Sequence, residues 1–378
     1  MRNIKPAAKA PVICLLTALG IYAQAANQAP APGPDVLVCK DGEKFVGHLV
    51  SSKDTSVVFK SDVAGEVTID WAKIQELHSA AKFAAIPKDV KLKNEQDSSK
   101  VPQGTVSMTD QKLEISPAAQ ETPQTVPVTN VAELVGEAAF QKAFQRRSFF
   151  QGWNGGVTAG VAYANSTQRS QSYTAAANLT RAVPGEDWLN LRSRTIVLFN
   201  EAYGSITQPN TPTVKTSITH FGVEQDWYVK PRLYVFVHAL LDHDYSQGLD
   251  LQQTYGGGLG FVVFKSDRQE FDVKASVDYI NQRFAISSEN KSLIGSTFGE
   301  TYVYNFPYKI VFSESGGFIP AWNDTNAYSA FANAGFTFPV YHRFGFTLAG
   351  TETYLNDPPV GFKKNSFTIT LGATYSFQ

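Results

Sequence analysis

Two absences limit what this chain can be. It holds only two cysteines, Cys14 and Cys39, among 378 residues. Cys14 falls in a stretch that we interpret below as a cleaved signal, so the mature chain would keep one thiol and no internal disulfide could form. No later segment has about 18 uninterrupted apolar residues, which excludes a candidate transmembrane helix.

Charge is also scarce and nearly balanced. Asp, Glu, Lys and Arg together make up 18% of the chain, and the formal net charge is −1. A broad nucleic-acid-binding surface is therefore not indicated. In contrast, the chain has 26 Phe, 16 Tyr and 28 Gly. This composition favours many aromatic-rich strands over a helical enzyme.

The first residues have the three parts of a secretory signal. Arg2, Lys5 and Lys9 form a basic start, an apolar stretch follows over 10–22, and Ala23-Gln24-Ala25 fits a small-x-small cleavage site. The apolar stretch is short for a membrane-spanning helix. We therefore predict a signal peptide over 1–25 and export from the cytoplasm.

The last strand carries the clearest pattern in the chain. Over 365–378 one face holds Phe367, Ile369, Leu371, Ala373, Tyr375 and Phe377, and the other holds Thr368, Thr370, Gly372, Thr374 and Ser376. A strand that is apolar on one face and small and polar on the other suits a wall between lipid and water. This pattern predicts the cell outer membrane as the location.

Alternation of the same kind continues through the C-terminal part of the chain. We expect twelve strands, at 152–164, 171–182, 188–203, 214–229, 232–245, 250–264, 269–283, 293–304, 308–322, 326–339, 342–356 and 365–378. An even number brings both ends of the strand series to one side of the membrane, as in bacterial single-chain barrels. The predicted fold class is all-β, with a transmembrane antiparallel β-barrel over 150–378.

The N-terminal part predicts a small β-rich periplasmic region. We expect a β-module, SH3-like, over 36–80, a linker over 81–103, a possible second β-module over 104–135 and a short helix over 131–147. Asp41-Gly42 marks a hairpin turn in the first module. Segments around Gly47 and Ile69 resemble those around Gly104 and Val126, although chance alternation could give the same weak repeat. The helix could lie under the barrel mouth or simply join the two regions.

Charged residues on the alternating strands identify the inner face. A basic side chain at the bilayer midplane costs about 2–4 kcal/mol, so the charged face of each strand should line the lumen. The predicted lumen-lining residues are Arg192, Arg194, His220, Glu224, Asp226, His238, Asp242, Asp272, Lys274 and Asp278. Their opposite charges could border a narrow aqueous path or pair up and close it, and the sequence leaves both possibilities open.

The most enzyme-like stretch is Asp242-His243-Asp244. With a turn at 230–231, His220 should fall opposite Leu241 and beside Asp242. Such an Asp/His pair at the external rim could activate water, and the two aspartates could help to bind calcium. The alternative is a set of solvated rim residues or lumen ion pairs. No serine nucleophile context or metal-ligand spacing accompanies them, so we predict no enzyme activity, cofactor or metal.

At this point the chain resembles a known family, the salt-induced outer-membrane proteins (YdiY-like, a domain of unknown function), over about 150–378. The resemblance rests on the signal, the Asp-Gly hairpin module, the segment 299–304 and the terminal strand. That strand also resembles the assembly signal of outer-membrane barrels, at Thr370, Gly372, Tyr375 and Phe377, although Gln378 follows the final aromatic. The resemblance implies insertion by the barrel-assembly machinery and brings no known active site.

Three functions are compatible with these patterns. The first is a narrow channel or envelope-stress (salt) component, with small solutes or ions as ligands. The second is a scaffold whose periplasmic modules bind envelope proteins while the barrel anchors them in outer-membrane lipid. The third is a rim hydrolase that uses the Asp/His pair. None of the three involves nucleic acid.

Overall fold

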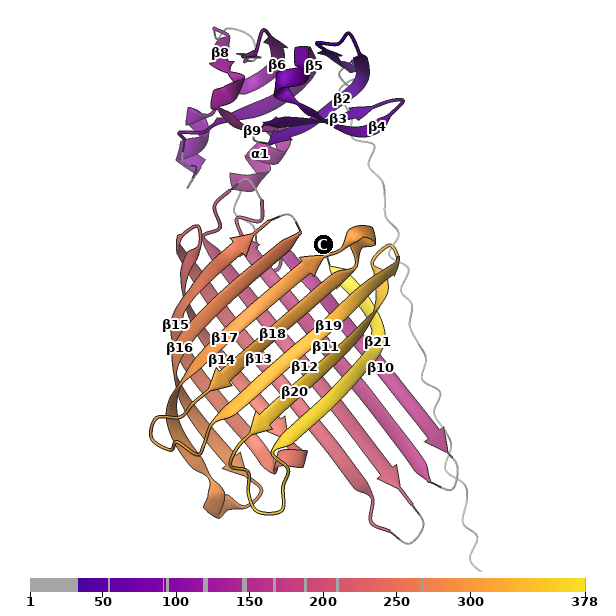
Figure 1. Ribbon diagram of the computed structural model, residues 1–378, viewed down its shortest axis with the longest axis vertical. Helices are drawn as coiled ribbons and strands as arrows, with labels where there is room; N and C mark the ends of the chain where they lie inside the picture. Colours follow the sequence, from indigo (N-terminus) through magenta and orange to yellow (C-terminus); the bar gives the residue numbers. More distant parts are fainter. Residues whose placement is uncertain are drawn as a thin grey trace, which may run out of the picture.

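The protein consists of a small β-rich domain and a β-barrel, joined by a short helix (Figure 1). The computed structural model describes residues 33–377 except 54, 91, 93, 94, 118–121, 145–147, 166–167, 187–188, 209–210 and 267. The predicted signal over 1–25 lies outside the described residues. Among those that are described, no helix has the length and apolar character needed to cross a bilayer.

The N-terminal domain is one antiparallel sheet of nine strands. Its strands are β1 (Asp35–Cys39), β2 (Lys44–Lys53), β3 (Ser56–Ser61), β4 (Gly65–Asp70), β5 (Ile74–Pro87), β6 (Gln103–Thr109), β7 (Lys112–Ser116), β8 (Gln124–Pro127) and β9 (Val131–Gly136). They follow the order β4-β3-β2-β1-β5-β6-β7-β8, and β9 pairs with both β2 and β5. Short 3-10 helices lie at Trp71–Lys73, Glu95–Lys100 and Val128–Asn130.

This single sheet corrects the predicted division into two modules and a linker. The predicted linker began at residue 81, but 81–87 form the second half of β5. β5 pairs with β1 through its first half, with β9 through its second half, and with β6 along most of its length. Leu37 and Phe59 from the first predicted module share one buried core with Met108 and Leu134 from the second. The two modules therefore form one domain, because a single long strand belongs to both.

The weak sequence repeat nevertheless corresponds to a structural repeat within that sheet. Three strands and a 3-10 helix, β2 to Trp71–Lys73, are followed by the start of β5, and the same order recurs from β6 to Val128–Asn130 and β9. A Cβ atom at Gly47 would collide with the carbonyl of Lys60, and one at Gly104 with the carbonyl of Ser116. Glycine is required at both positions for the same reason, a close backbone approach.

The connecting helix is shorter than the sequence predicted. Residues 131–136 form β9, and helix α1 covers Glu137–Phe144. Phe140 of α1 is fully buried against a cluster that includes Ala84 and Val135, and Leu189 from the barrel packs against the same cluster. The helix therefore lies between the sheet and the barrel and contacts both.

The C-terminal part is a closed barrel of twelve antiparallel strands, as the sequence predicted. They are β10 (Trp153–Asn165), β11 (Arg169–Val183), β12 (Ser193–Thr207), β13 (Val214–Lys230), β14 (Leu233–Asp244), β15 (Leu249–Lys265), β16 (Gln269–Phe284), β17 (Lys291–Asn305), β18 (Val311–Ile319), β19 (Ser329–Tyr341), β20 (Phe344–Leu355) and β21 (Asn365–Phe377). Short 3-10 helices follow β14, β16 and β17, at Tyr245–Gln247, Ser287–Glu289 and Pro307–Lys309. The barrel end that carries the short turns after β13, β15 and β19 faces the N-terminal domain (Figure 1).

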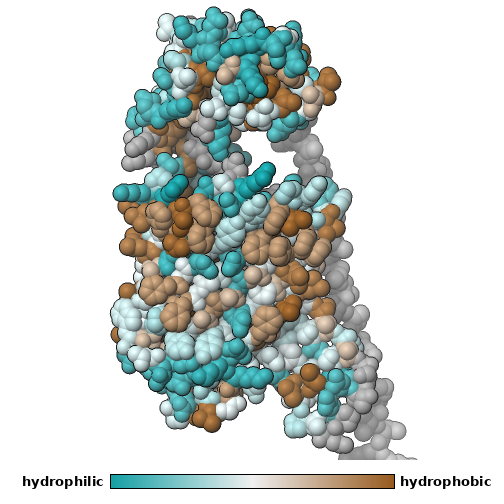
Figure 2. Space-filling model, in the orientation of Figure 1, coloured by the Kyte–Doolittle hydropathy of each residue, from teal (hydrophilic) through white to brown (hydrophobic). Residues whose placement is uncertain are grey.

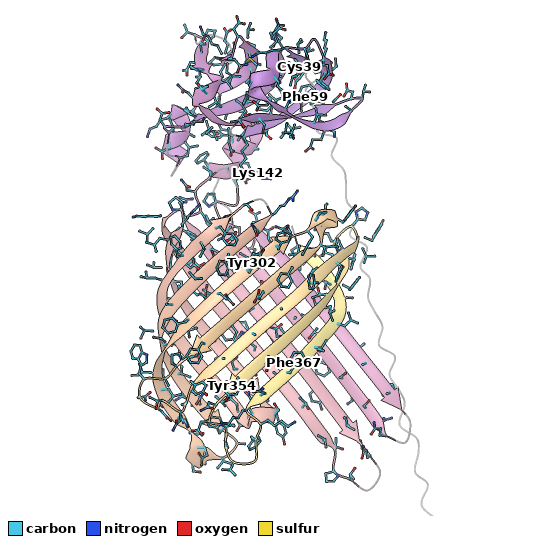
Figure 3. All side chains as sticks on the ribbon, in the orientation of Figure 1. Cys39, Phe59, Lys142, Tyr302, Tyr354 and Phe367 are labelled. Atoms are coloured by element: carbon cyan, nitrogen blue, oxygen red, sulfur yellow. The ribbon has the colours of Figure 1, made fainter. Side chains whose placement is uncertain are left out.

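The outer face of the barrel carries apolar side chains over its middle and polar ones at the far rim (Figure 2). Tyr302 lies toward the end that faces the N-terminal domain, and Tyr354 and Phe367 lie toward the other end (Figure 3). Tyr173 and Tyr203 stack on the outer face at 5.0 Å. An outer band flanked by aromatic residues is the pattern of a membrane-spanning barrel.

Two details of the faces differ from the predicted pattern. Tyr228, an aromatic residue near the end of β13, points inward instead of outward and packs on Tyr234 with 5.0 Å between ring centroids. The outer face also includes acidic residues, which share the strand face of exposed aromatic or apolar side chains: Glu201, Glu300, Glu314 and Glu352. Glu201 accepts a hydrogen bond from Thr219 on the neighbouring strand. Such a donor reduces the free-energy cost of placing a carboxylate there.

Candidate functional site in the barrel lumen

Contacts between strands that are not neighbours identify the inner face directly. Arg194 on β12 lies 2.9 Å from Asp272 on β16, although three strands separate β12 from β16. Lys274 on β16 likewise lies 2.6 Å from Glu224 on β13. Side chains can meet in this way only across the interior of the barrel. The charged face of these strands therefore points into the lumen.

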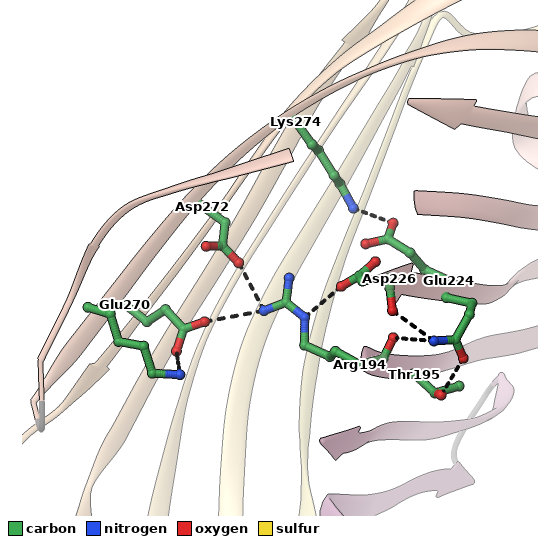
Figure 4. Close-up of polar contacts among 9 residues, drawn as sticks. Arg194, Thr195, Glu224, Asp226, Glu270, Asp272 and Lys274 are labelled. Carbon is green, nitrogen blue, oxygen red and sulfur yellow. Dashed lines mark hydrogen bonds and ion pairs between the residues drawn. The ribbon is translucent and has the colours of Figure 1, made fainter. Parts of the chain in front are cut away.

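Arg194 is the centre of the largest cluster. Its guanidinium donates to Asp226 at 2.7 Å and to Glu270 at 3.2 Å, and it also pairs with Asp272 (Figure 4). Lys265 pairs with the second oxygen of Glu270 at 2.9 Å. Planar guanidinium groups with several fixed donors suit this arrangement of three carboxylates. The cluster ties β12, β13 and β16 together at the end that faces the N-terminal domain.

Aromatic rings fill the space beside this cluster. The guanidinium of Arg194 lies 5.2 Å from the ring centroid of Tyr234 and 5.8 Å from that of Tyr228. Lys274 lies 5.5 Å from the ring of Phe236. Tyr234 and Phe236 are almost completely buried, and so is Asp226. This side of the lumen is therefore packed with side chains, and cation–π contacts add to the ion pairs.

A second pair, His238 and Asp278, continues the polar wall toward the external end. Nε2 of His238 lies 3.0 Å from Oδ1 of Asp278, and both side chains are buried. Asp278 also accepts hydrogen bonds from Ser276 and Thr297. A buried carboxylate with several donors is well compensated for the loss of water.

Glycines in β15 make this pair possible. His238 lies on β14 and Asp278 on β16, so β15 passes between them. Gly256 stands opposite both residues, and a Cβ there would collide with both side chains. Gly260 in the same strand gives its space to the ring of Tyr234. Glycine at these positions therefore leaves space on the inner wall, in which side chains from β14 and β16 can meet.

The Asp/His pair at the external end is formed, with a register one residue away from the predicted one. His220 stands directly opposite Asp242, not opposite Leu241, and its Nδ1 contacts the Asp242 carboxylate. The turn lies at 231–232, one residue later than predicted, and a bulge between Tyr228 and Lys230 offsets part of this displacement. Gln252 donates to the other oxygen of Asp242 at 3.4 Å. The pair is thus part of the polar wall, and hydrolysis at the rim stays an alternative hypothesis.

Asp244 has a structural role. One of its oxygens accepts from the backbone N–H groups of Ser246 and Gln247 and from the Ser246 hydroxyl, which caps the short helix at Tyr245–Gln247. Within the described part of the chain, no group of three or more His, Cys, Asp or Glu side chains is placed to hold a metal ion.

The remaining predicted site residues are Arg192 and the four residues of the assembly signal. Arg192 precedes β12, in an exposed position at the end that faces the N-terminal domain. Thr370 and Gly372 are on the inner face of β21, whereas Tyr375 and Phe377 are on its outer face. Tyr375 packs against Phe344 at 5.1 Å and Phe377 at 5.2 Å. No contact links these four residues to the charged wall.

The opposite wall of the lumen is lined mainly by small side chains. Thr158, Thr374, Thr347 and Thr337 form a continuous chain of hydroxyl contacts at 2.8, 2.7 and 3.0 Å across β10, β21, β20 and β19. We call these four residues the threonine belt. Inner-face residues beyond the belt, such as Ala176, Asn178 and Thr351, keep part of their surface accessible. The lumen is thus filled along β12–β16, whereas inner-face residues along β10, β11 and β19–β21 keep more accessible surface, apart from Phe331 and Leu355, which pack into apolar clusters.

Loops narrow the mouth of the barrel that lies away from the N-terminal domain. Gln247, after β14, donates to the carbonyls of Thr353 and Lys364 at 3.2 and 2.7 Å, and so reaches the loop between β20 and β21. Lys291 pairs with Asp324 at 3.1 Å and with Asp357, which joins three external connections. Next to the loop that contains Gln247, a cleft of about 410 Å³ remains. It is lined mainly by residues of β11, β12, β13 and β21.

Comparison with known families identifies the barrel sequence. The family described as "Protein of unknown function, DUF481" matches residues 157–377. The chain belongs to the DUF481 family. The matched part begins near the start of β10 and ends with β21, so this family corresponds to the barrel. Its description carries no activity and does not mention salt. No curated protein matches the chain.

Several solved barrels are similar to this chain. The NanC porin is 10% identical, covers 59% of this chain and 99% of its own, and has a TM-score of 0.34. The translocator domain of the autotransporter NalP from Neisseria meningitidis is 10% identical, covers 64% and 93%, and has a TM-score of 0.32. The outer membrane channel DcaP of Acinetobacter baumannii is 12% identical, covers 60% and 96%, and has a TM-score of 0.27. At these values, no function is transferred from them.

Proposed function

We propose that the protein is a narrow outer-membrane channel for small solutes or ions, with its N-terminal domain in the periplasm. The observation that carries this proposal is the unequal filling of the lumen. The wall along β12–β16 is packed by the Arg194 cluster and its aromatic neighbours. The wall along β10, β11 and β19–β21 has mostly small inner side chains, and the larger Phe331 and Leu355 lie near its end away from the N-terminal domain. The sequence left two possibilities open, a narrow aqueous path or a lumen closed by paired charges. In this proposal, the charges pair along one wall and a path remains along the other.

The charges beside this path favour cations. The inner carboxylates Glu224, Asp226, Asp242, Glu270, Asp272 and Asp278 outnumber Arg194, Lys265 and Lys274. Rings or walls of carboxylates raise the local concentration of cations in a pore. We therefore expect a small conductance with a preference for K⁺ over Cl⁻.

Planar-bilayer recording of the purified full-length protein tests the channel. Under a KCl gradient, we expect stepwise currents, and the sign of their reversal potential should be that of a cation-selective pore. The neighbouring alanines Ala176 and Ala177 on β11 provide a matched pair, since Ala176 faces the lumen and Ala177 faces outward. Ala176→Trp should reduce the single-channel conductance by at least half, whereas Ala177→Trp should leave it unchanged. Silence across salts and voltages, or equal effects of the two variants, would contradict the channel.

The resemblance to salt-induced proteins supports a narrower proposal, that the channel serves during salt stress. Protein abundance in cells shifted to high salt measures this directly. We expect a rise of severalfold, and unchanged abundance would remove the salt-specific part while leaving the channel intact.

The N-terminal domain supports a second candidate function, a scaffold for envelope proteins. This domain has its own continuous buried core, separate from the barrel. Deletion of residues 33–144 should abolish the cellular phenotype of the protein and leave barrel insertion and conductance unchanged. A normal phenotype after this deletion would exclude the scaffold.

A further inference from the structure

The seam that closes the barrel is paired along only part of its length. Between β10 and β21 the ladder runs from Gly155 opposite Phe377 to Ala159 opposite Ala373, and it stops there. β10 continues to Asn165, and β21 begins at Asn365. Within the described part of both strands, 160–165 and 365–372 therefore form no ladder with each other. Figure 1 shows the two strands running apart toward the end away from the N-terminal domain.

The unpaired stretch lies in the half of the barrel that would occupy the outer leaflet. Phe367 lies in the half of the barrel away from the N-terminal domain (Figure 3). The side chains that border the opening on the membrane side are apolar and exposed: Val161, Tyr163, Phe367, Ile369 and Leu371. The seam therefore opens toward lipid rather than toward the external solution alone.

Backbone groups at such an opening need partners. In hydrocarbon, each unpaired N–H or C=O group costs several kcal/mol, so open edges are tolerated only next to water or a polar ligand. The threonine belt closes the half of the same seam that lies nearer the N-terminal domain, through Thr158 and Thr374. A close backbone approach at Gly160 and Gly372 marks the point where the two strands separate. The seam is thus fixed at one end and free at the other.

The space behind the opening is a cleft of suitable chemistry. The cleft of about 410 Å³ is lined both by inner-face residues, including Thr174, Ala202 and Thr216, and by Phe367 and Ile369 from the outer face of β21. It therefore reaches from the lumen through the wall to the lipid side. Its lining mixes hydroxyl groups with apolar side chains, and its volume is within the range of small-molecule sites.

We propose that the open half of the β10–β21 seam is a lateral passage, through which small uncharged amphipathic molecules move between the lumen cleft and the outer leaflet. The hydroxyl groups of the cleft bind the polar end of such a molecule, and the apolar border of the seam admits its hydrocarbon part. The inference extends the proposed channel, because it adds a second exit to the same lumen.

Disulfide locking of the seam tests this passage. If the existing ladder were continued, Val161 would stand opposite Leu371, and the pair Val161→Cys/Leu371→Cys, made in a Cys39→Ala chain, locks the open half. The control pair Ala159→Cys/Ala373→Cys joins residues that already face each other. The full-length protein is reconstituted in phospholipid vesicles with a diazirine-bearing decanol as the probe. Illumination then labels any cleft residue that the probe reaches, and mass spectrometry of β11–β13 peptides measures the labelling.

We expect the oxidised 161/371 pair to reduce labelling of the cleft at least fivefold, reduction of the disulfide to restore it, and the 159/373 pair to change it less than twofold. Equal labelling of the locked and unlocked 161/371 protein would overturn the passage. Intermolecular instead of intramolecular disulfides would also overturn it, because the edges would then pair with a second copy. Variants are compared only where unboiled samples migrate as folded barrels.

Spin labels at Tyr163 and Ile369 provide a second measurement that needs no cross-link. We expect a broad distribution of distances between these two labels, and it should extend to longer distances than the distribution for labels at Ala159 and Ala373. Indistinguishable distributions would mean a closed seam and no passage. Ion conductance of the locked barrel separates this inference from the channel. Persistent conductance with lost labelling supports both, whereas seam-dependent labelling without any conductance supports the passage and removes the axial channel.

Discussion

At the scale of single residues, glycine determines where charged side chains can meet inside the barrel. Gly256 has no side chain, and His238 and Asp278 use the space that a Cβ atom would take. Sequence patterns show which face a glycine occupies, but they do not show which neighbour fills the vacated space. This is why the His238–Asp278 contact could not be predicted, although both residues were placed on a polar face.

Substitution of Gly256 tests this explanation. Gly256→Ala should separate His238 from Asp278 and lower the free energy of unfolding by about 3 kcal/mol, because a buried charged group loses its partner. Urea unfolding of the barrel in lipid vesicles measures the change. Gly350→Ala is the control, since a Cβ at Gly350 meets only Phe367 at ordinary van der Waals distance. Equal stability of the two variants would contradict the proposed role of Gly256.

The reactivity of the Cys39 thiol can be used to follow the folding of the N-terminal domain. Its side chain is only 5% exposed, and burial raises the pKa of the thiol, with Asp41 and Glu43 acting in the same direction. Alkylation by iodoacetamide should therefore be slow in the folded domain and fast after unfolding. In the unfolded chain the thiol ionises near its ordinary pKa of about 8.5. The domain should thus lose stability as pH rises above that value, because ionisation then favours the unfolded state. Rapid alkylation of the folded protein at neutral pH would contradict this burial.

At the scale of elements, the threonine belt joins the first and last barrel strands. Thr374 contacts both Thr158 and Thr347, so Thr374→Val should remove two hydrogen bonds, each with a net contribution of about 1 kcal/mol. We expect unboiled samples to lose their folded migration at a lower temperature than the wild type. Thr368→Val is the control, because Thr368 lies on the same face of β21 beyond the belt. A larger effect at Thr368 than at Thr374 would argue against the belt.

The strands themselves were largely predictable, and the reason is physical. A strand between lipid and water must alternate, and each of the twelve barrel strands carries that alternation in its own residues. Contacts set by three-dimensional closure carry no such local signal. The short ladder between β10 and β21 and the bridge from Gln247 to Lys364 both join distant segments. In the N-terminal domain, the same limit hid the fact that β5 belongs to both repeats.

At the scale of the whole molecule, the barrel and the N-terminal domain should be separable. Each has its own packing, and the contact of Leu189 with the α1 cluster is the main apolar link described between them. Unboiled full-length protein should migrate as a compact folded species that unfolds on boiling, because most of the strand edges are paired. A chain without residues 33–144 should show the same behaviour. Loss of this heat-dependent migration on deletion would mean that the barrel needs the domain to fold.

The position of the charged wall has a consequence for biogenesis. Arg194 and Asp226 are 32 residues apart in the chain, and Arg194 and Glu270 are 76 apart, whereas Thr158 and Thr374 are separated by 216. Contacts between segments that are close in the sequence lose less chain entropy on forming than contacts between segments that are far apart. A nascent curved sheet from β12 to β16 can therefore neutralise its own buried charges before the ring is complete. The last step of insertion is then the pairing of the first strand with the last, and this is the strand pair with the shortest ladder in the barrel.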